Sequence, residues 1–191
     1  MVATPSTMLP LGTVAPDFAL PDPSGAVHTL DALVDGKAGL LVAFICNHCP
    51  YVKHIRRELA LLTDKWQQRD LAVVGINSND ADAYPDDAPA AMAVEARTVG
   101  YRFPYLVDDT QAVALAYRAA CTPDFFLFDR DRRLAYRGQF DGSRPKNDLP
   151  VTGADLDAAV KAVLDGRPVE ADQRASLGCN IKWRPGVDPG Y

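Results

Sequence analysis

The sequence has little cysteine, no concentrated positive charge and no long apolar run, and each shortage excludes a class of protein. Four cysteines in 191 residues are too few for a secreted fold held together by disulfides. A formal net charge of −5 without a basic block argues against binding to nucleic acid or to an anionic membrane surface. The longest apolar run, residues 40–46, is far too short to span a bilayer.

The N-terminal segment lacks a targeting pattern. Residues 1–11 contain no positively charged stretch followed by an apolar one, so we expect no secretion signal and a cytoplasmic protein. In that reducing compartment a C-x-x-C pair is redox-active or metal-binding rather than structural. The length fits a single domain over residues 1–191, with a loose leader at 1–12 and an irregular tail at 167–191.

The chain is organised around an apolar run that ends in two cysteines. Residues 40–46 are rich in branched and aromatic side chains, which predicts a buried strand. Apolar residues then recur at helical spacing, which predicts a helix ending near Gln68. Cys46 and Cys49 therefore lie where a strand meets a helix, and the free N–H groups and dipole of the helix favour a thiolate there. We expect Cys46 to be the better exposed thiol and to be ionised near neutrality.

The other segments alternate between strand and helix patterns. Expected strands cover 15–20 and 27–30 (as a hairpin), 70–77, 104–107, 125–128 and 134–140; expected helices cover 90–99, a segment through Tyr117 capped by Asp108 and Asp109, and 152–164 with a capping box of Thr152 and Asp155. The loop at 78–89 is rich in Asp, Asn and Pro and follows the strand at 70–77, at a sheet edge where ligands bind. This order predicts an α/β fold with a mixed central sheet and helices on both faces.

Three features resemble the thioredoxin superfamily. They are the Cys-Asn-His-Cys-Pro motif at 46–50, the Thr122–Pro123 step before a Phe-rich strand, and the opening Ala-Pro-Asp-Phe at 15–18 followed by Leu-Pro-Asp at 20–22. The opening is similar to peroxiredoxins and to thiol-disulfide reductases of the TlpA/ResA type. Together with 44–53, 77–80, 121–124 and 178–183, these motifs resemble a peroxiredoxin-like, AhpC/TSA branch of the redoxin group. The resemblance implies a thioredoxin-like fold with an N-terminal hairpin extension and a C-terminal tail.

The resemblance also implies roles for individual residues. Cys46 would be the attacking cysteine and Cys49 the resolving one. Pro123 would be a cis-proline facing the disulfide, and Thr122 would offer backbone hydrogen bonds to an extended substrate. One departure matters, because peroxiredoxins place Thr or Ser three residues before the peroxidatic cysteine and this chain has Ala43 there. The departure argues against efficient peroxide reduction.

Two interpretations are open for each of three further residues. His48 is either a surface residue on a turn or a stabiliser of the Cys46 thiolate, in which case the pair is more oxidising than thioredoxin. Cys121 is either a buried core residue or a third redox thiol. Cys179 either helps to pack the tail or, with the tail covering the site, exchanges with Cys46 or Cys121.

These patterns predict a thiol-disulfide oxidoreductase that needs no cofactor and no metal. Its partners would be a protein or small-molecule disulfide and a reducing partner of thioredoxin type. One alternative is a thiol peroxidase that acts through a sulfenic acid on Cys46. An alternative of another class is a zinc- or copper-binding protein that uses this set of soft ligands: Cys46, His48, Cys49, His54, Cys121 and Cys179.

Overall fold

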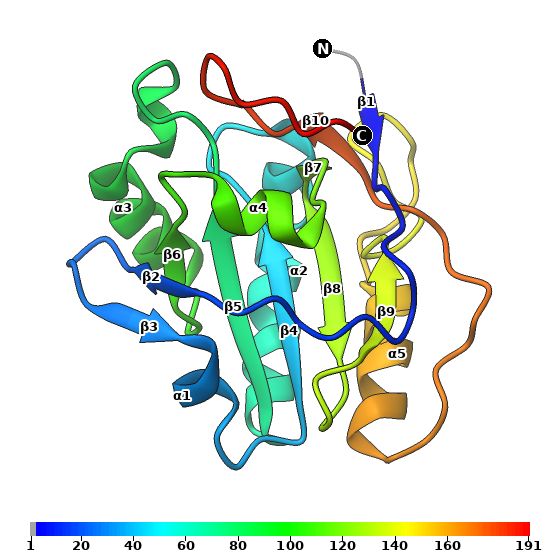
Figure 1. Ribbon diagram of the computed structural model, residues 1–191. Coiled ribbons are helices and arrows are strands. Elements are labelled where there is room, and N and C mark those ends of the chain that lie inside the picture. Colours follow the sequence, from blue (N-terminus) through cyan, green and yellow to red (C-terminus); the bar gives the residue numbers. More distant parts are fainter. Residues whose placement is uncertain (1–2) are drawn as a thin grey trace.

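A five-stranded mixed sheet forms the centre of the computed structural model, which describes residues 3–191 (Figure 1). The strand order is β6-β5-β4-β8-β9. Strands β4, β5 and β6 run parallel; β8 runs antiparallel to its neighbours β4 and β9, so β9 has the same direction as β4. The bounds are β4 Gly39–Phe44, β5 Leu71–Asn77, β6 Tyr105–Val107, β8 Asp124–Phe128 and β9 Leu134–Gly138. The predicted mixed sheet is confirmed.

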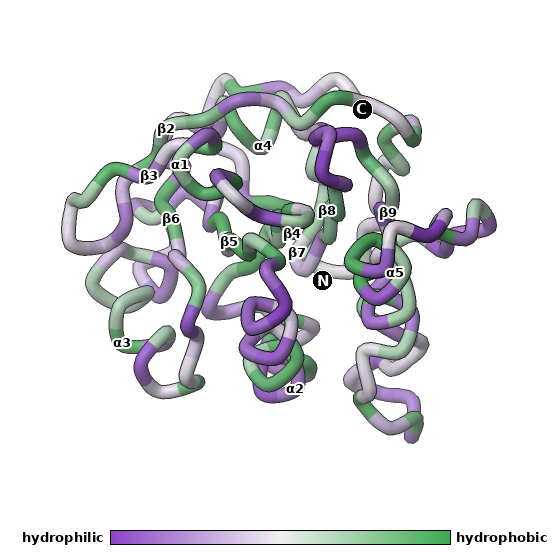
Figure 2. Tube along the Cα trace, turned by 90° about the horizontal axis from the view of Figure 1, so that it is seen from below, coloured by the Kyte–Doolittle hydropathy of each residue, from purple (hydrophilic) through white to green (hydrophobic). Residues whose placement is uncertain are grey.

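Helices cover both faces of this sheet, as the alternation of segments predicts (Figure 2). On one face lie α2 Pro50–Gln67, α3 Pro89–Val99 and α5 Ala154–Leu164. On the other lie α1 Leu30–Val34, α4 Ala112–Tyr117 and the predicted hairpin of β2 Ala19–Pro21 and β3 Val27–Thr29. No helix within residues 3–191 has both the length and the apolar character needed to cross a membrane.

The central strands are apolar throughout because both of their faces are buried. Successive side chains of a strand point to opposite faces, so β8 sends Phe125 and Leu127 toward α2 and α5. It sends Phe126 and Phe128 toward α4, where both rings pack against Tyr117. A strand buried on both faces reads as a continuous apolar run, and this is why the segment at 40–46 shows no alternation.

The leader and the tail are more ordered than predicted. A second sheet joins β1 Ala3–Pro5, β10 Leu177–Asn180 and β7 Cys121–Thr122 in the order β1-β10-β7. The irregular tail expected over 167–191 is therefore wrong for β10, and the loose leader over 1–12 is wrong for β1; residues 1–2 lie outside the described part. Gly178 makes this sheet possible, because a Cβ there would lie 2.0 Å from the Thr122 carbonyl oxygen.

Helix ends show which local patterns are reliable. Gly100 ends α3 with φ 86°, as predicted, and Asp108 accepts hydrogen bonds from the first turn of α4. Asp109 does not cap that helix; it pairs with Arg184.

The predicted Thr152–Asp155 capping box is also wrong. A distant carboxylate, Asp141 Oδ2, accepts from the N–H groups of Thr152 and Gly153 at 2.7 Å each. Asp155 instead accepts a hydrogen bond from Gln139. A side chain from another segment therefore fixes the backbone just before α5, and Thr152 accepts from the Ala154 N–H at 3.3 Å.

The double-sided core generates a stability prediction. Phe126 is 0% exposed and packs edge-on against the rings of Phe44 and Tyr117. We expect Phe126→Ala to lower the free energy of unfolding by about 3–5 kcal/mol, from lost burial and a residual cavity. Leu61→Ala, at a side chain 58% exposed on α2, is the control and should stay within about 0.5 kcal/mol. Urea unfolding curves measure both, and equal midpoints for the two variants would contradict the packing described here.

Candidate functional site

The two cysteines of the C-x-x-C pair lie at different depths of the strand-to-helix junction. Helix α2 begins at Pro50, so Cys49 is its N-cap residue, whereas Cys46 lies three residues earlier, beyond β4. Cys46 is 1% exposed and Cys49 is 0% exposed. The expectation that Cys46 is accessible is therefore wrong. The segments around it, which include β7, β10 and the loop containing Asp87, enclose both sulfurs.

The Thr122–Pro123 step lies directly against the pair, as predicted. Its peptide bond is cis. The Sγ of Cys46 lies 3.2 Å from the Thr122 hydroxyl, and the Sγ of Cys49 lies 3.1 Å from the Thr122 carbonyl oxygen. However, the backbone edge of Thr122 is not open to an extended substrate, because Thr122 is paired with Cys179 of β10.

A third sulfur completes the cluster. The Sγ of Cys179 lies 2.9 Å from that of Cys49. The sequence predicts exchange of Cys179 with Cys46 or Cys121, but the sulfur that it contacts is that of Cys49. Cys121 is buried beside the cluster, with its thiol donating to the Pro123 carbonyl oxygen at 3.6 Å.

The charge distribution within the pair is opposite to the predicted one. Hydrogen bonds from the thiols of Cys46 and Cys179 and from the N–H of Val52 outweigh burial and lower the pKa of Cys49 to about 5. Donation to Cys49 and burial raise the pKa of Cys46, and the nearby charge of Asp87 adds to this. The anion is thus favoured on Cys49 mainly because the Cys46 thiol donates to it, and the Val52 N–H in the first turn of α2 adds a smaller contribution. The Thr122 carbonyl accepts a hydrogen bond from Cys49 only while that thiol is protonated.

His48 is held by an acid that the sequence analysis did not single out. His48 Nδ1 lies 2.6 Å from Asp87 Oδ2, and its ring stacks on Tyr84. Asp87 also accepts from the Asn47 N–H and from the Asn79 amide. Although burial raises the pKa of Asp87, these hydrogen bonds outweigh it and hold the pKa below its usual range. His48 is therefore not a free surface residue.

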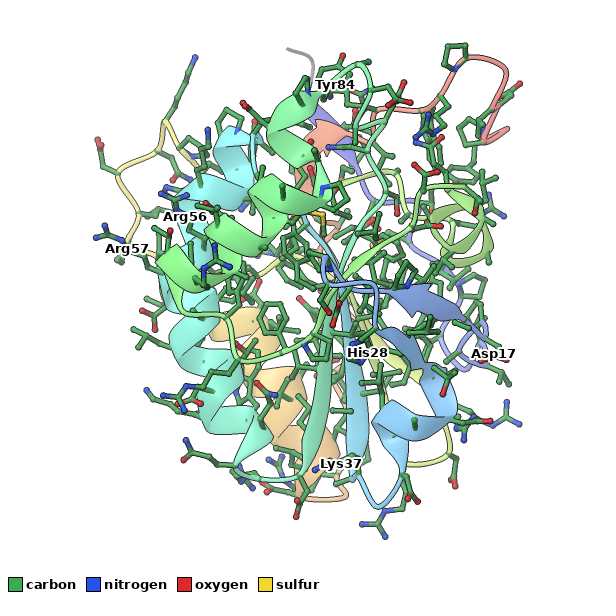
Figure 3. All side chains as sticks on the ribbon, turned by 90° about the vertical axis from the view of Figure 1, so that its left-hand side faces the viewer. Asp17, His28, Lys37, Arg56, Arg57 and Tyr84 are labelled. Carbon is green, nitrogen blue, oxygen red and sulfur yellow. The ribbon has the colours of Figure 1, made fainter. Side chains whose placement is uncertain are left out.

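Asp87 closes the 3₁₀ turn η1 Pro85–Asp87 within the loop predicted at 78–89. Tyr84, just before it, lies at the end of the molecule where β1 and β10 also lie (Figure 3). The composition of this loop and its place after β5 predict that it lies at the edge of the sheet where ligands bind. The loop contains several aspartates, and the prediction does not choose among them. Nothing in the sequence distinguishes Asp87, which is 2% exposed, from its exposed neighbour Asp86.

The six ligands predicted for a metal do not form one set. Within residues 3–191, the group of potential ligand atoms found close together belongs to Cys46, His48 and Asp87, whose atoms lie within 4.8 Å of one another. His54 lies apart and contacts Ser143 at 3.1 Å.

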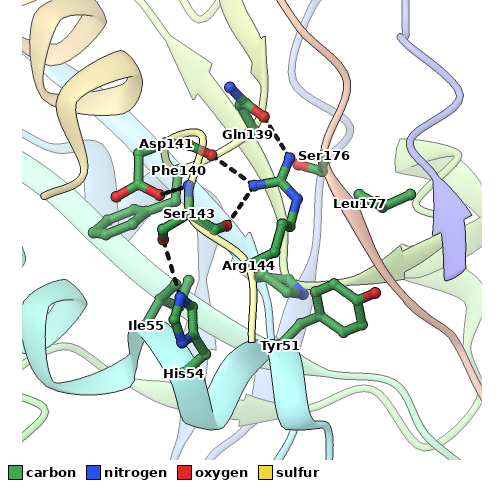
Figure 4. A pocket seen from close by; sticks show the side chains of 11 residues that line it. Tyr51, His54, Ile55, Gln139, Phe140, Asp141, Ser143, Arg144, Ser176 and Leu177 are labelled. Carbon is green, nitrogen blue, oxygen red and sulfur yellow. Dashed lines mark hydrogen bonds between the residues drawn. The ribbon is translucent and has the colours of Figure 1, made fainter. Parts of the chain in front are cut away.

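A small pocket adjoins the other side of Pro123 (Figure 4). His54 and Tyr51 enter it from the first turns of α2, and Arg144 enters from the loop after β9. The Arg144 guanidinium donates to three uncharged acceptors, the carbonyls of Asp141 and Ser143 and the side chain of Gln139. The pocket is therefore polar, and Pro123, the residue after Thr122, is part of its lining.

Asp124 follows the cis-proline and begins β8, one residue before the strand predicted at 125–128. Its side chain is 0% exposed, and Oδ1 has no hydrogen-bond partner. The other oxygen accepts a long hydrogen bond from the Ala120 N–H at 3.4 Å. Burial raises the pKa of Asp124 to about 7, so the carboxyl group is neutral in mildly acidic solution.

Comparisons with known proteins agree with this geometry. A family model described as the AhpC/TSA family matches residues 11–137. The search among curated proteins gave no match.

Among solved structures, the chain is similar to a hypothetical protein from Sinorhizobium meliloti 1021, with 54% identity and a TM-score of 0.94 over 96% of this chain and 100% of that one. It is similar to an uncharacterized conserved protein from Geobacillus kaustophilus, with 51% identity and a TM-score of 0.94 over 98% and 99%. A thiol:disulfide interchange protein of the thioredoxin family from Chlorobium tepidum TLS has 20% identity and a TM-score of 0.61 over 80% and 97%. This last likeness concerns the fold, which is thioredoxin-like.

The neutral carboxyl group of Asp124 generates a pH prediction. The unfolded chain releases this proton near the ordinary value of 3.8, whereas the folded chain keeps it until about 7. The unfolded state therefore binds fewer protons in this interval, and the free energy of unfolding falls as pH rises from about 4 to 7.

We expect Asp124→Asn to remove this contribution. The free energy of unfolding of the variant minus that of wild type should therefore increase from pH 5 to pH 8. Urea unfolding at both pH values measures it. An identical pH dependence in the two proteins would show that Asp124 ionises normally.

Proposed function

Because the chain belongs to the AhpC/TSA family, which includes thiol-disulfide oxidoreductases and peroxiredoxins, we propose that it is a thiol-disulfide oxidoreductase using Cys46 and Cys49. The observation that carries the proposal is the convergence of both sulfurs on one residue beside the cis-proline. Each sulfur lies within 3.2 Å of an oxygen of Thr122. A pair of thiols at this spacing can close a short disulfide.

The reaction begins with a proton transfer inside the pair. The Cys46 thiol donates a hydrogen bond to Cys49, and when this proton moves to Cys49 the Cys46 thiolate attacks one sulfur of the substrate disulfide. The first product leaves as a thiolate and takes a proton, and a mixed disulfide remains on Cys46. Cys49 then loses its proton and attacks the Cys46 sulfur, which releases the second product and forms the Cys46–Cys49 bond. Two electrons pass from the pair to the substrate, and a reducing partner of thioredoxin type restores them.

Other residues position this pair. The Thr122 hydroxyl, 3.2 Å from Cys46 Sγ, donates to the thiolate formed there. Pro123, next to Thr122 in the chain, lines the pocket with Arg144. With Cys46 1% exposed, the site favours small or flexible disulfides over a rigid protein surface.

A second candidate activity, peroxide reduction, has one observation in its favour. Ala43 offers no hydroxyl, but Thr122 places one 3.2 Å from Cys46 Sγ. The Cys46 thiolate would attack the O–O bond and become a sulfenic acid with release of water. Cys49 would then displace a second water and close the disulfide. The proposed roles of Cys46 and Cys49 are the same in both reactions.

The first test replaces the two thiols separately. We expect Cys46→Ser and Cys49→Ser each to lower steady-state reduction of glutathione disulfide by at least about a hundredfold, because each removes one of the two exchange steps. Cys121→Ser, at a buried thiol that bonds to a carbonyl group instead, is the matched control and should stay within about twofold. The same three variants are assayed with hydrogen peroxide, and preferential turnover of peroxide would favour the second candidate. Full activity of Cys46→Ser with both substrates would overturn the proposal.

The second test concerns Asp87 as a positioning residue. Its charge contributes to the raised pKa of Cys46, so Asp87→Asn should move the pH midpoint of Cys46 alkylation downward, as measured on the alkylated peptide. Asp86→Asn is the control, because this neighbouring carboxylate is exposed. An unchanged midpoint in Asp87→Asn would show that the Asp87 charge does not affect the pKa of Cys46.

The oxidising potential predicted from His48 stays a prediction. A measured reduction potential above about −270 mV, the value for thioredoxin, would support it.

A further inference from the structure

We propose that Cys179 is a third exchange partner, which attacks the Cys46–Cys49 disulfide at Cys49 and forms a Cys49–Cys179 disulfide while releasing Cys46. This inference rests on the proposed function, because that reaction generates the Cys46–Cys49 bond. It gives the oxidised chain two disulfide isomers, only one of which leaves Cys46 as a thiol beside His48 and Asp87.

The contact that carries the inference joins two segments far apart in the sequence. Cys49 Sγ and Cys179 Sγ are 2.9 Å apart, and the backbone N–H of Cys179 also donates a hydrogen bond to the Cys49 sulfur. The sulfurs therefore need to approach by roughly 0.9 Å to bond, since the S–S bond of a disulfide is about 2.05 Å long.

Strand pairing holds Cys179 in this place. Residue 179 pairs with Thr122 on one side and with Ala3 on the other, so β10 is the middle strand of its sheet. Gly178 allows the strand to press against the Thr122 backbone. The thiol of Cys179 is thus presented to Cys49 by two strands rather than by a loose tail.

The neighbouring Cys121 shows that this arrangement is selective. Cys121 pairs with Asn180 in the same sheet and is as deeply buried as Cys179, at 0% and 2% exposed. Its thiol bonds to the Pro123 carbonyl oxygen rather than to a sulfur. Two buried cysteines one residue apart in register therefore have different chemistry, and Cys121 is a matched control.

The exchange step balances without an added reductant or oxidant. Cys179 loses its proton and its thiolate attacks Cys49 Sγ, so the Cys49–Cys179 bond forms as the Cys46–Cys49 bond breaks. Cys46 leaves as a thiolate and takes up the proton. Burial raises the pKa of Cys179 to about 12, and its hydrogen bond to Cys49 and the charge of Cys49 add to this. The last two effects disappear when Cys49 is part of a disulfide, so the attacking thiol is easier to ionise in the oxidised chain.

Disulfide mapping of the full-length chain tests the inference. Wild type, Cys46→Ser, Cys179→Ser and Cys121→Ser are equilibrated in glutathione buffers of increasing oxidation, quenched with acid, alkylated and digested without reductant. Mass spectrometry should find both the Cys46–Cys49 and the Cys49–Cys179 linkage in wild type and in Cys121→Ser. It should find the Cys49–Cys179 linkage as the main product in Cys46→Ser.

The outcomes separate this inference from the proposed function. If Cys46→Ser carries glutathione on Cys49 and no Cys49–Cys179 linkage, the inference is wrong, although the Cys46–Cys49 linkage in wild type still supports the oxidoreductase. If wild type shows only the Cys46–Cys49 linkage in every glutathione buffer, the inference is also wrong. Cys46→Ser retains all residues of β10, so this reading does not depend on whether Cys179→Ser folds.

A backbone variant gives an independent check. A Cβ at position 178 would lie 2.0 Å from the Thr122 carbonyl oxygen, so Gly178→Ala must move β10 while keeping every thiol. We expect this variant to lose at least about tenfold of the Cys49–Cys179 linkage relative to wild type and to retain the Cys46–Cys49 linkage. An unchanged yield of Cys49–Cys179 would mean that strand placement does not govern the exchange.

Discussion

The structure depends on the contact between the start of α2 and the Thr122–Pro123 step. Thr122 offers its hydroxyl to Cys46 and its carbonyl oxygen to Cys49, and its backbone pairs with the strand that carries Cys179. Its neighbour Pro123 lines a polar pocket. Thr122 therefore contacts all three segments that carry the sulfurs of Cys46, Cys49 and Cys179. Any displacement of this step changes the distances among all of them, because the core around it is buried on both faces of the sheet.

The pair of cysteines is asymmetric in its surroundings. Cys49 receives hydrogen bonds from the Cys46 and Cys179 thiols and from the Val52 N–H of α2, whereas Cys46 lies close to His48 and Asp87. In this arrangement the residue that stores the negative charge differs from the residue proposed to attack. In the proposed reaction Cys49 receives the proton of Cys46 and afterwards serves as the resolving thiol.

Local patterns in the sequence predicted the strands of the central sheet, the major helices and the cluster at Thr122–Pro123, because each depends on neighbouring residues or on a family motif. The features that were missed depend on distant ones. Asp141 fixes the segment before α5 from another loop, Asp87 is selected from similar aspartates by the fold, and β10 pairs with β1 near the first residues and with β7 in the middle of the chain. The expectation that Cys46 lies at the start of the helix was an avoidable error. Proline is favoured in the first position of a helix, so Pro50 already marks Cys49 as the N-cap residue.

The three-stranded sheet β1-β10-β7 has a consequence for synthesis of the chain. Its middle strand, Leu177–Asn180, lies near the end of 191 residues, whereas both cysteines of the C-x-x-C pair emerge from the ribosome much earlier. Domains fold from the N-terminus as they are made, so Cys46 and Cys49 are synthesised before β10, the strand that helps to enclose them. During that interval β10 does not yet enclose the two thiols, so oxidants reach them more easily than in the folded chain, where both are buried.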